Sequence, residues 1–362
     1  MEDRMKALRL YGPMDMRLEE RPVPSCREDE MVIRILGCGI CGSDLKNFAG
    51  GHEWNAPPEE RFIETPVTAG HEFYGEIVKK GENVTDYELG ELMISEQIIP
   101  CKECRFCKNG QYWMCQNLKM YGFQREAEGG FAQYMRIHRR GINHHIPKHF
   151  TVEQAALIEP YACSMHAVER ARIRHEDVVV VSGLGAIGLG MVTMARLAIP
   201  KLIIGLDLRE NRRALAEKFG ADLVLDPSQC DVAEEILKRT DGYGCDVYLE
   251  AAGSEASVRQ GLKAVRSLGR YVQFGIFAKD IMADWNIIGD GKEIDVLGSH
   301  LGPGCFEAVI AGIDRGLIAT EGVVTHKFAL EKWDEAYAAA VHDPSAIKVV
   351  MTPNARERGE KL

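Results

Sequence analysis

The stretch DVVVVSGLGAIGLG, residues 177–190, decides the fold class of this chain. A run of β-branched apolar residues ends in the pattern Gly-x-Gly-x-x-Gly and leads into the apolar segment LGMVTMARLA. Glycines at such a strand-to-helix turn permit a tight bend and let a pyrophosphate approach the N-terminus of the helix. The pattern therefore predicts a dinucleotide-binding turn. Its residues are Gly183, Gly185, Ala186, Ile187 and Gly188.

The segments that follow alternate between strand and helix patterns, as a doubly wound parallel sheet requires. The next strand-like run, KLIIGLD, ends in Asp207, nineteen residues after Gly188. An acidic residue at this place accepts hydrogen bonds from the adenosine ribose and repels a 2′-phosphate, which predicts NAD rather than NADP. Arg209 and Arg212 argue the other way, because arginines near the ribose accommodate that phosphate. Further strands are predicted at 221–226, 245–253, 270–277 and 293–300, and helices at 231–239 and 256–269.

Length, charge and the N-terminal segment limit the class of protein. A chain of 362 residues favours two domains. A net charge of −10 without a basic stripe argues against a nucleic-acid partner. The segment MEDRMKALRLYG lacks the pattern of a secretory signal, so a cytoplasmic protein is expected. The glycines and Arg196 within the apolar run 178–199 favour a strand, turn and helix over a membrane span.

Four of the eleven cysteines stand close together in CKECRFCKNGQYWMC, residues 101–115. An odd number of cysteines without an export signal favours metal ligands and free thiols over disulfides. The two-residue gaps let thiolates turn towards one point and the longer gap closes a tetrahedron, which predicts a structural zinc site. An iron–sulfur cluster is the rival, but its motif has a three-residue gap to a Cys-Pro that is absent here. The predicted ligands are Cys101, Cys104, Cys107 and Cys115.

Cys41, His71 and Glu159 form a second candidate metal site, because they are good zinc ligands spread along the chain as in catalytic centres. They stand in the segments GCGICGSDLKNF, AGHEFYGEIV and LIEPYACSMHA. Cys38 makes a C-x2-C pair with Cys41, and we interpret it as a packing residue. Cys163, four residues after Glu159, is the less favoured alternative ligand.

Together with the glycine turn and the four cysteines, these segments resemble the zinc-dependent medium-chain dehydrogenase/reductase family across nearly the whole chain. The resemblance implies an α/β protein with a GroES-like β-barrel catalytic domain at 1–158 and 299–362. It implies a Rossmann doubly wound parallel sheet at 159–298, which binds NAD. It also implies two zinc ions per subunit, one catalytic and one structural.

The resemblance assigns roles to the residues of the second site. Cys41, His71 and Glu159 map onto the catalytic zinc ligands, and a glutamate as the third ligand points to the polyol branch of the family. Glu72 matches a glutamate that lies behind the metal or exchanges with water as a ligand. Asp44 matches a carboxylate that orients a zinc-bound histidine.

Three further positions are interpreted by the same resemblance. Ser43 matches a hydroxyl that relays the substrate proton, and its alternative is a helix cap. Lys46 stands where many alcohol dehydrogenases carry a histidine, so the outer part of the relay is open. Residues 250–253 and 274–277 are expected to border the cofactor, with Gly275 the least replaceable.

The implied reaction is the NAD-dependent oxidation of a secondary hydroxyl of a small polyol, of the erythritol or threitol type, to a ketose such as erythrulose. Zinc would lower the pKa of the hydroxyl before hydride transfer. The alternatives are a threonine, phosphopolyol or other secondary-alcohol dehydrogenase, and, outside enzymes, a zinc-stabilised nucleotide-binding protein. The expected partners are a small-molecule substrate and identical subunits in a homodimer or homotetramer, with no nucleic acid and no membrane.

Overall fold

A computed structural model of the chain describes residues 3–354, without the side chains at 52 and 53. The chain divides into two compact units, Met1–Glu159 with Val324–Leu362, and Pro160–Val323. Residues 299–323, expected in the first domain, lie in the second unit. Hydrogen bonds tie this segment there, because Ala319 N donates to Thr193 Oγ1 and Tyr161 Oη donates to Ala319 O.

The second unit contains the expected doubly wound sheet. Among the described residues, its six parallel strands run in the order β13-β12-β11-β14-β15-β16. The chain starts at β11 and winds outward in both directions, so β11 and β14 mark the switch point at which such sheets bind ligands. The strands are β11 (Val178–Ser182), β12 (Leu202–Leu206), β13 (Leu223–Leu225), β14 (Cys245–Glu250), β15 (Val265–Gln273) and β16 (Asp295–Gly298).

One helix of this unit is shorter than its sequence pattern predicts. Helix α8 (Glu255–Ala264) does not continue to 269, because β15 begins at Val265, which pairs with Cys245 of β14. Leu268 has a φ of +58°, a left-handed conformation that no α-helix contains. Pairing within the sheet therefore overrides the helical pattern of ASVRQGLKAVRSLG.

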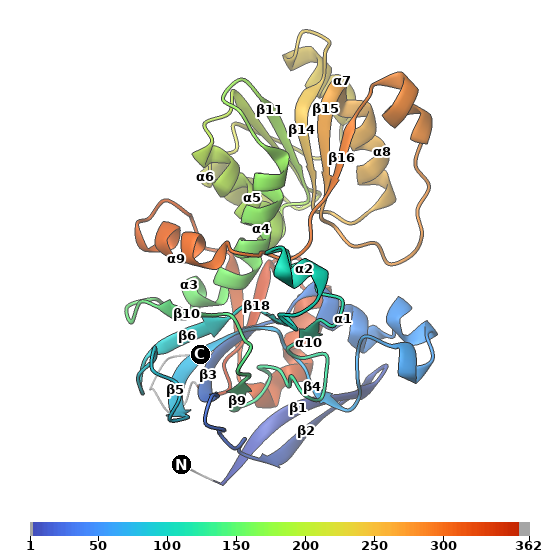
Figure 1. Ribbon diagram of the computed structural model, residues 1–362. Helices are drawn as coiled ribbons and strands as arrows, with labels where there is room; N and C mark the ends of the chain where they lie inside the picture. Colours follow the sequence, from blue (N-terminus) through green and yellow to red (C-terminus); the bar gives the residue numbers. More distant parts are fainter. Residues whose placement is uncertain (1–2, 355–362) are drawn as a thin grey trace. The chain divides into compact units, whose positions relative to one another are not determined.

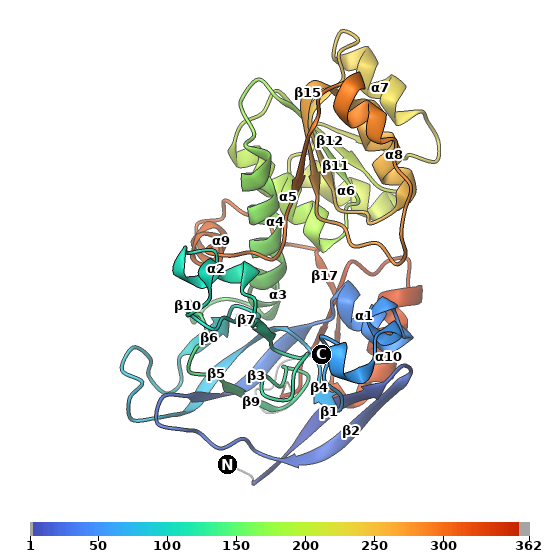
Figure 2. The ribbon, with the colours of Figure 1, turned by 45° about the vertical axis from the view of Figure 1, so that its right-hand side comes forward.

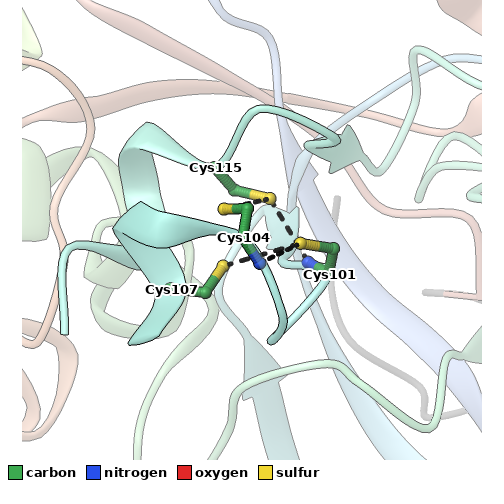
Figure 3. Close-up of side chains that lie close together, drawn as sticks. All are labelled: Cys101, Cys104, Cys107 and Cys115. Carbon is green, nitrogen blue, oxygen red and sulfur yellow. Dashed lines mark hydrogen bonds between the residues drawn. The ribbon is translucent and has the colours of Figure 1, made fainter. Parts of the chain in front are cut away.

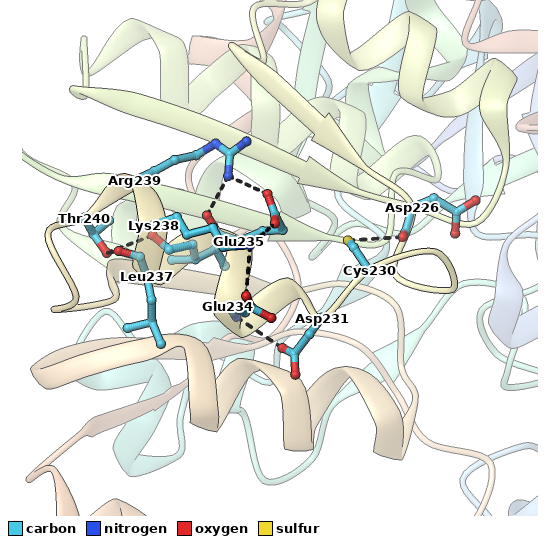
Figure 4. A network of polar contacts seen from close by, with 10 residues as sticks. Asp226, Cys230, Asp231, Glu234, Glu235, Leu237, Lys238, Arg239 and Thr240 are labelled. Atoms are coloured by element: carbon cyan, nitrogen blue, oxygen red, sulfur yellow. Dashed lines mark hydrogen bonds and ion pairs between the residues drawn. The ribbon is translucent and has the colours of Figure 1, made fainter.

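Helices cover both faces of the sheet. Helices α5 (Ala186–Leu197) and α6 (Glu210–Lys218) lie on one face, and α7 (Val232–Arg239) and α8 lie on the other (Figure 1). Helix α7 is held in place by apolar packing and by an N-terminal cap. Its buried Val232 and Ile236 face the core, and Asp231 accepts a hydrogen bond from Glu234 N at 3.1 Å (Figure 4). Its exposed ion pairs add little stability.

Most strand pairs of the first unit are antiparallel. A three-stranded sheet has the order β2-β1-β4, and Figures 1 and 2 show β1 and β2 as a long two-stranded ribbon. A larger sheet has the order β10-β6-β5-β3-β18-β17, with β9 paired to β3, and β7 pairs with β8. The strands are β1 (Arg4–Gly12), β2 (Asp15–Pro22), β3 (Met31–Gly39), β4 (Val67–Thr68), β5 (Glu72–Lys80), β6 (Leu92–Ser95), β7 (Ile98–Ile99), β8 (Lys119–Met120), β9 (Tyr134–Ile137), β10 (Asn143–Ile146), β17 (Val324–Phe328) and β18 (Lys348–Met351).

The last segment of the chain completes this unit. Strands β17 and β18 are parallel and joined through helix α10 (Trp333–His342), and β18 pairs with β3 in the middle of the sheet. The apolar core beneath includes Leu10, Ile35, Phe73 and Phe131. Within residues 3–354, no helix combines the length and the apolar character needed to cross a bilayer.

Candidate metal centres and cofactor turn

The four predicted cysteine ligands converge in the segment after β7. Helix α2 (Arg105–Lys108) and the turns around it bring their sulfur atoms within 4.8 Å of one another (Figure 3). Cys101 Sγ lies 3.9 Å from Cys107 Sγ, and Cys104 Sγ lies 3.9 Å from Cys115 Sγ. Sulfur atoms around a tetrahedral zinc ion with Zn–S bonds of about 2.3 Å are roughly 3.8 Å apart. The cluster therefore fits a four-sulfur metal site.

Backbone N–H groups lower the pKa of Cys101 and Cys104, whereas burial raises the pKa of Cys107 and Cys115. Cys101 N donates to Cys115 Sγ and Cys104 N donates to Cys101 Sγ, each at 3.3 Å. The backbone N–H groups of Cys107 and Gln116 lower the pKa of Cys104 to about 6. All eleven cysteines of the described chain are free thiols. These N–H groups stabilise deprotonated sulfur, which is the form that a metal ion binds.

The second candidate site is assembled by the register of β3 and β5. Gly39, the last residue of β3, lies opposite Glu72, the first residue of β5. Cys41 follows β3 as the N-cap residue of α1 (Gly42–Ala49), and His71 directly precedes β5. This pairing brings Cys41, His71 and Glu72 together, with one ligand atom of each within 4.8 Å of the others.

Asp44 adjusts the charge of this group. One of its carboxylate oxygens accepts a hydrogen bond from Cys41 N at 2.9 Å, and the other lies 3.6 Å from His71 Nδ1. Burial disfavours the charged imidazole, but Asp44 and Cys41 outweigh it and raise the pKa of His71 well above its usual value. His71 Nδ1 makes no hydrogen bond among the described residues. The Cys41 thiol, the His71 imidazole and the Glu72 carboxylate are all ligand types that zinc binds. This group therefore fits a zinc ion.

Glu159 is not a member of this close group. It is a buried residue in the first turn of α4 (Ile158–Ala171), and its Oε1 accepts a hydrogen bond from Gln97 Nε2 at 2.5 Å. Its charge acts on Lys348, the ion-pair partner of Glu72, so it shares the same neighbourhood. The alternative ligand Cys163 is buried on α4 and belongs to no metal-ligand group among the described residues. Cys38 lies in the apolar core.

Lys348 was not foreseen from the sequence. It begins β18 and forms a buried ion pair with Glu72, while its Nζ donates to Ile40 O at 3.1 Å. Burial alone would lower the pKa of Lys348, but the charges of Glu72 and Cys41 outweigh burial and raise it. A Cβ on Gly39 would overlap this ion pair. The only feature of the sequence that could have indicated this ion pair is a lysine at the first position of the apolar strand KVVM.

The relay candidates lie on α1. Ser43 is in the first turn, and the N-cap residue is Cys41, so the alternative in which Ser43 caps a helix is wrong. Lys46 lies further along α1, and burial lowers its pKa, opposed by the charge of Cys41. Ser43 is partly exposed, two residues from the Cys41 thiol.

The glycine turn has the form that a dinucleotide requires. Gly183 has a φ of +89°, and a Cβ there would lie 2.6 Å from Ala252 N. A Cβ on Gly188 would overlap the carbonyl oxygen of Gly183. At Gly185, the N-cap residue of α5, an added Cβ would meet only Arg212 Nη1 at 3.9 Å. This open space at a helix N-terminus fits a pyrophosphate.

The carboxyl ends of β12 and β14 border this turn. Asp207 follows β12, and its carboxylate accepts hydrogen bonds from Leu184 N at 2.8 Å and Arg209 N at 2.9 Å. Arg212 Nη1 lies 3.7 Å from the same carboxylate. Glu250 ends β14 and is fully buried, with Oε1 accepting from Ala252 N and Gly253 N.

Gly275, predicted to be the least replaceable of the residues bordering the cofactor, leaves little room for a side chain. A Cβ there would lie 2.5 Å from Gly253 N and would overlap Glu250. Its own N–H donates to Glu250 O at 2.9 Å. Glu250 thus holds the loop around Gly253 and Gly275 rather than offering its carboxylate to a ligand.

Comparisons with known proteins agree with this arrangement. The family described as alcohol dehydrogenase GroES-like domain matches residues 27–148, and the zinc-binding dehydrogenase family matches residues 186–315. An erythritol/L-threitol dehydrogenase from Mycolicibacterium smegmatis is 42% identical over 355 residues, which cover 97% of this chain and 98% of that protein. A sorbitol dehydrogenase from Halalkalibacterium halodurans is 35% identical, covering 96% of this chain and 99% of that protein.

Solved structures give the same result for the fold. A chain assigned as a zinc-binding dehydrogenase from Sinorhizobium meliloti 1021, bound to NADP, superimposes with a TM-score of 0.87 at 29% identity. The match covers 97% of this chain and 100% of that chain. The GroES-like domain and the doubly wound sheet expected from the sequence are thereby confirmed.

Proposed function

The chain belongs to the zinc-dependent medium-chain dehydrogenase/reductase family, in its polyol branch, and we propose that it oxidises a secondary hydroxyl of a small polyol with NAD. The observation that carries this proposal is the meeting of Cys41, His71 and Glu72 where β3 and β5 pair. A four-carbon sugar alcohol of the erythritol or threitol type is the proposed substrate, on the strength of the 42% identical relative. The product is a ketose such as erythrulose.

The chain's own residues take the following parts in the reaction. Cys41, His71 and Glu159 would hold the catalytic zinc, with Glu72 beside it as an occasional ligand. When bound, zinc supplies a Lewis acid that lowers the pKa of the substrate hydroxyl. Ser43 would accept the hydroxyl proton and pass it to solvent, and a bound nicotinamide would supply the acceptor for the hydride of the carbinol carbon. One alcohol and one NAD⁺ thus give one ketone, one NADH and one proton.

NAD is proposed as the acceptor because of Asp207. Its carboxylate lies at the end of β12 beside the glycine turn, where a 2′-phosphate would meet a negative charge. Arg209 and Arg212 stand on the first turn that follows, and Arg212 is paired with Asp207. The ion pair with Asp207 neutralises the Arg212 charge that would otherwise bind the 2′-phosphate of NADP.

A dehydrogenase assay tests this proposal. NADH formation is measured with erythritol, D- and L-threitol, sorbitol, threonine and a phosphorylated polyol, and the panel is repeated with NADP. The highest kcat/KM is expected for a four-carbon polyol with NAD, and chelation of zinc should abolish it. Glu159→Gln should lose activity at least about 100-fold together with zinc. Glu153→Gln, which alters an ion pair with Lys327, is the matched control and should remain active.

Other outcomes of the same panel would overturn the proposal. Higher kcat/KM for threonine or for the phosphorylated polyol would assign the chain to those members of the family. NADH binding without oxidation of any alcohol would favour a nucleotide-binding protein stabilised by zinc.

A further inference from the structure

A third group of metal-ligand side chains lies in the second unit, outside the two centres described above. His166 and Glu169 are three residues apart on α4 and therefore share one face of the helix. Cys305 is the N-cap residue of α9 (Phe306–Asp314). One ligand atom of each of these residues lies within 4.8 Å of the other two. Because Cys305 is far in sequence from the two residues on α4, no sequence motif predicts this group.

The spacing within this group suits a metal ion. Cys305 Sγ lies 3.7 Å from Glu169 Oε2 and 3.5 Å from Pro303 O. Around a tetrahedral zinc ion with bonds of about 2.3 Å to sulfur and about 2.0 Å to oxygen, a sulfur and an oxygen are roughly 3.5 Å apart. Only a small movement would bring the thiolate and the carboxylate onto one ion.

The burial of this group also suits a metal ion. The Cys305 side chain is 2% exposed and that of His166 is 9% exposed, whereas Glu169 faces solvent and leaves a path for entry. A neutral imidazole such as that of His166 can bind a metal ion directly.

We propose that His166, Glu169 and Cys305 form a binding site for a divalent transition metal of the zinc type. A thiolate and an imidazole select zinc-like ions over magnesium or calcium, which prefer oxygen ligands alone. The bound ion would join α4 to the segment that precedes α9. This site goes beyond the proposed dehydrogenase activity and does not depend on it.

The zinc content of the full-length protein tests the site. Wild-type protein, Cys305→Ser and His166→Gln are loaded with zinc, dialysed together, and assayed for zinc per chain by mass spectrometry. Each variant is expected to hold one zinc ion fewer than wild type. Cys26→Ser is the matched control, because its thiol donates to the carbonyl oxygen of Glu30 and belongs to no metal-ligand group among the described residues. The quantity compared is the difference in zinc content between wild type and each variant. Zinc at the two other centres is common to all of these proteins and cancels.

Two further measurements keep the test decisive if a buried variant fails to fold. Glu169→Gln changes an exposed side chain, and competition with a zinc indicator should show about 10- to 100-fold weaker binding at one site. In cobalt-loaded protein, the thiolate-to-cobalt absorption comes from all cobalt-bound cysteines. In Cys305→Ser this absorption should be smaller than in wild type by the contribution of one thiolate. Unchanged zinc affinity in Glu169→Gln, or equal zinc content in wild type and both buried variants, would overturn the proposal and leave Cys305 as a hydrogen-bonded thiol.

Discussion

Gln97 holds the carboxylate of Glu159, since its Nε2 donates a 2.5 Å hydrogen bond to Glu159 Oε1 and both side chains are buried. Its neighbour Glu96 accepts hydrogen bonds from Tyr112 Oη at 2.9 and 3.0 Å. Tyr112 stands within the four-cysteine segment. Two consecutive residues after β6 therefore connect the cysteine cluster to the proposed catalytic carboxylate.

The change Gln97→Leu removes the donor that orients Glu159 and keeps a side chain of similar size. We expect kcat/KM for the alcohol to fall about 10- to 100-fold, because the partners of a metal ligand have effects of that order. Steady-state kinetics and zinc content measure this effect. Ser95→Ala is the control, since Ser95 Oγ donates to Ile142 O and not to Glu159. Equal kinetics for the two variants would show that Gln97 does not position the carboxylate.

Features encoded in contiguous residues could be predicted from the sequence. The glycine turn, the presence of six strands in the doubly wound sheet and the cysteine cluster each follow from short local patterns. The end of α8 could not be predicted, because pairing of Val265 with Cys245 decides it. The ion pair of Lys348 with Glu72 depends on β18 joining β3 beside β5, a register that no local pattern specifies. The group around Cys305 depends on tertiary packing in the same way.

Two alanine substitutions separate the structural and ligand-facing glycines of the turn. In Gly188→Ala the new Cβ meets the backbone of Gly183, so we expect a loss of about 1–3 kcal/mol in the free energy of unfolding. In Gly185→Ala the Cβ enters open space, so stability should be unchanged while NADH binding weakens at least about tenfold. Thermal melting and NADH fluorescence titration measure the two effects. If Gly185→Ala bound NADH normally, no cofactor group would occupy that space.

Asp207→Asn tests the choice of cofactor. The amide retains an oxygen that can accept the hydrogen bond from Leu184 N, but it no longer repels a 2′-phosphate, and Arg212 loses its ionic partner. We expect the ratio of kcat/KM for NADP to that for NAD to rise at least about tenfold. Asp226→Asn, at the end of the neighbouring strand β13, is the matched control and should leave the ratio unchanged. A constant ratio in Asp207→Asn would remove Asp207 from cofactor selection.

Lys348→Met leaves the buried carboxylate of Glu72 without its ionic partner. Removing one member of a buried ion pair costs about 3–5 kcal/mol, because the remaining charge stays desolvated. We expect the free energy of unfolding to fall by that order in Lys348→Met and to recover largely in the double variant Glu72→Gln/Lys348→Met.

Strand β17, which pairs with β18, supplies a control for these variants. Lys327 on β17 pairs with Glu153 at 2.8 Å, and both side chains are about one-third exposed. Because exposed ion pairs contribute only about 0–1 kcal/mol, Lys327→Met should be mild. Denaturant unfolding of the wild type and the three variants measures the difference. If Lys348→Met were as mild as Lys327→Met, or if the double variant were no more stable than Lys348→Met, the two buried charges would not be coupled.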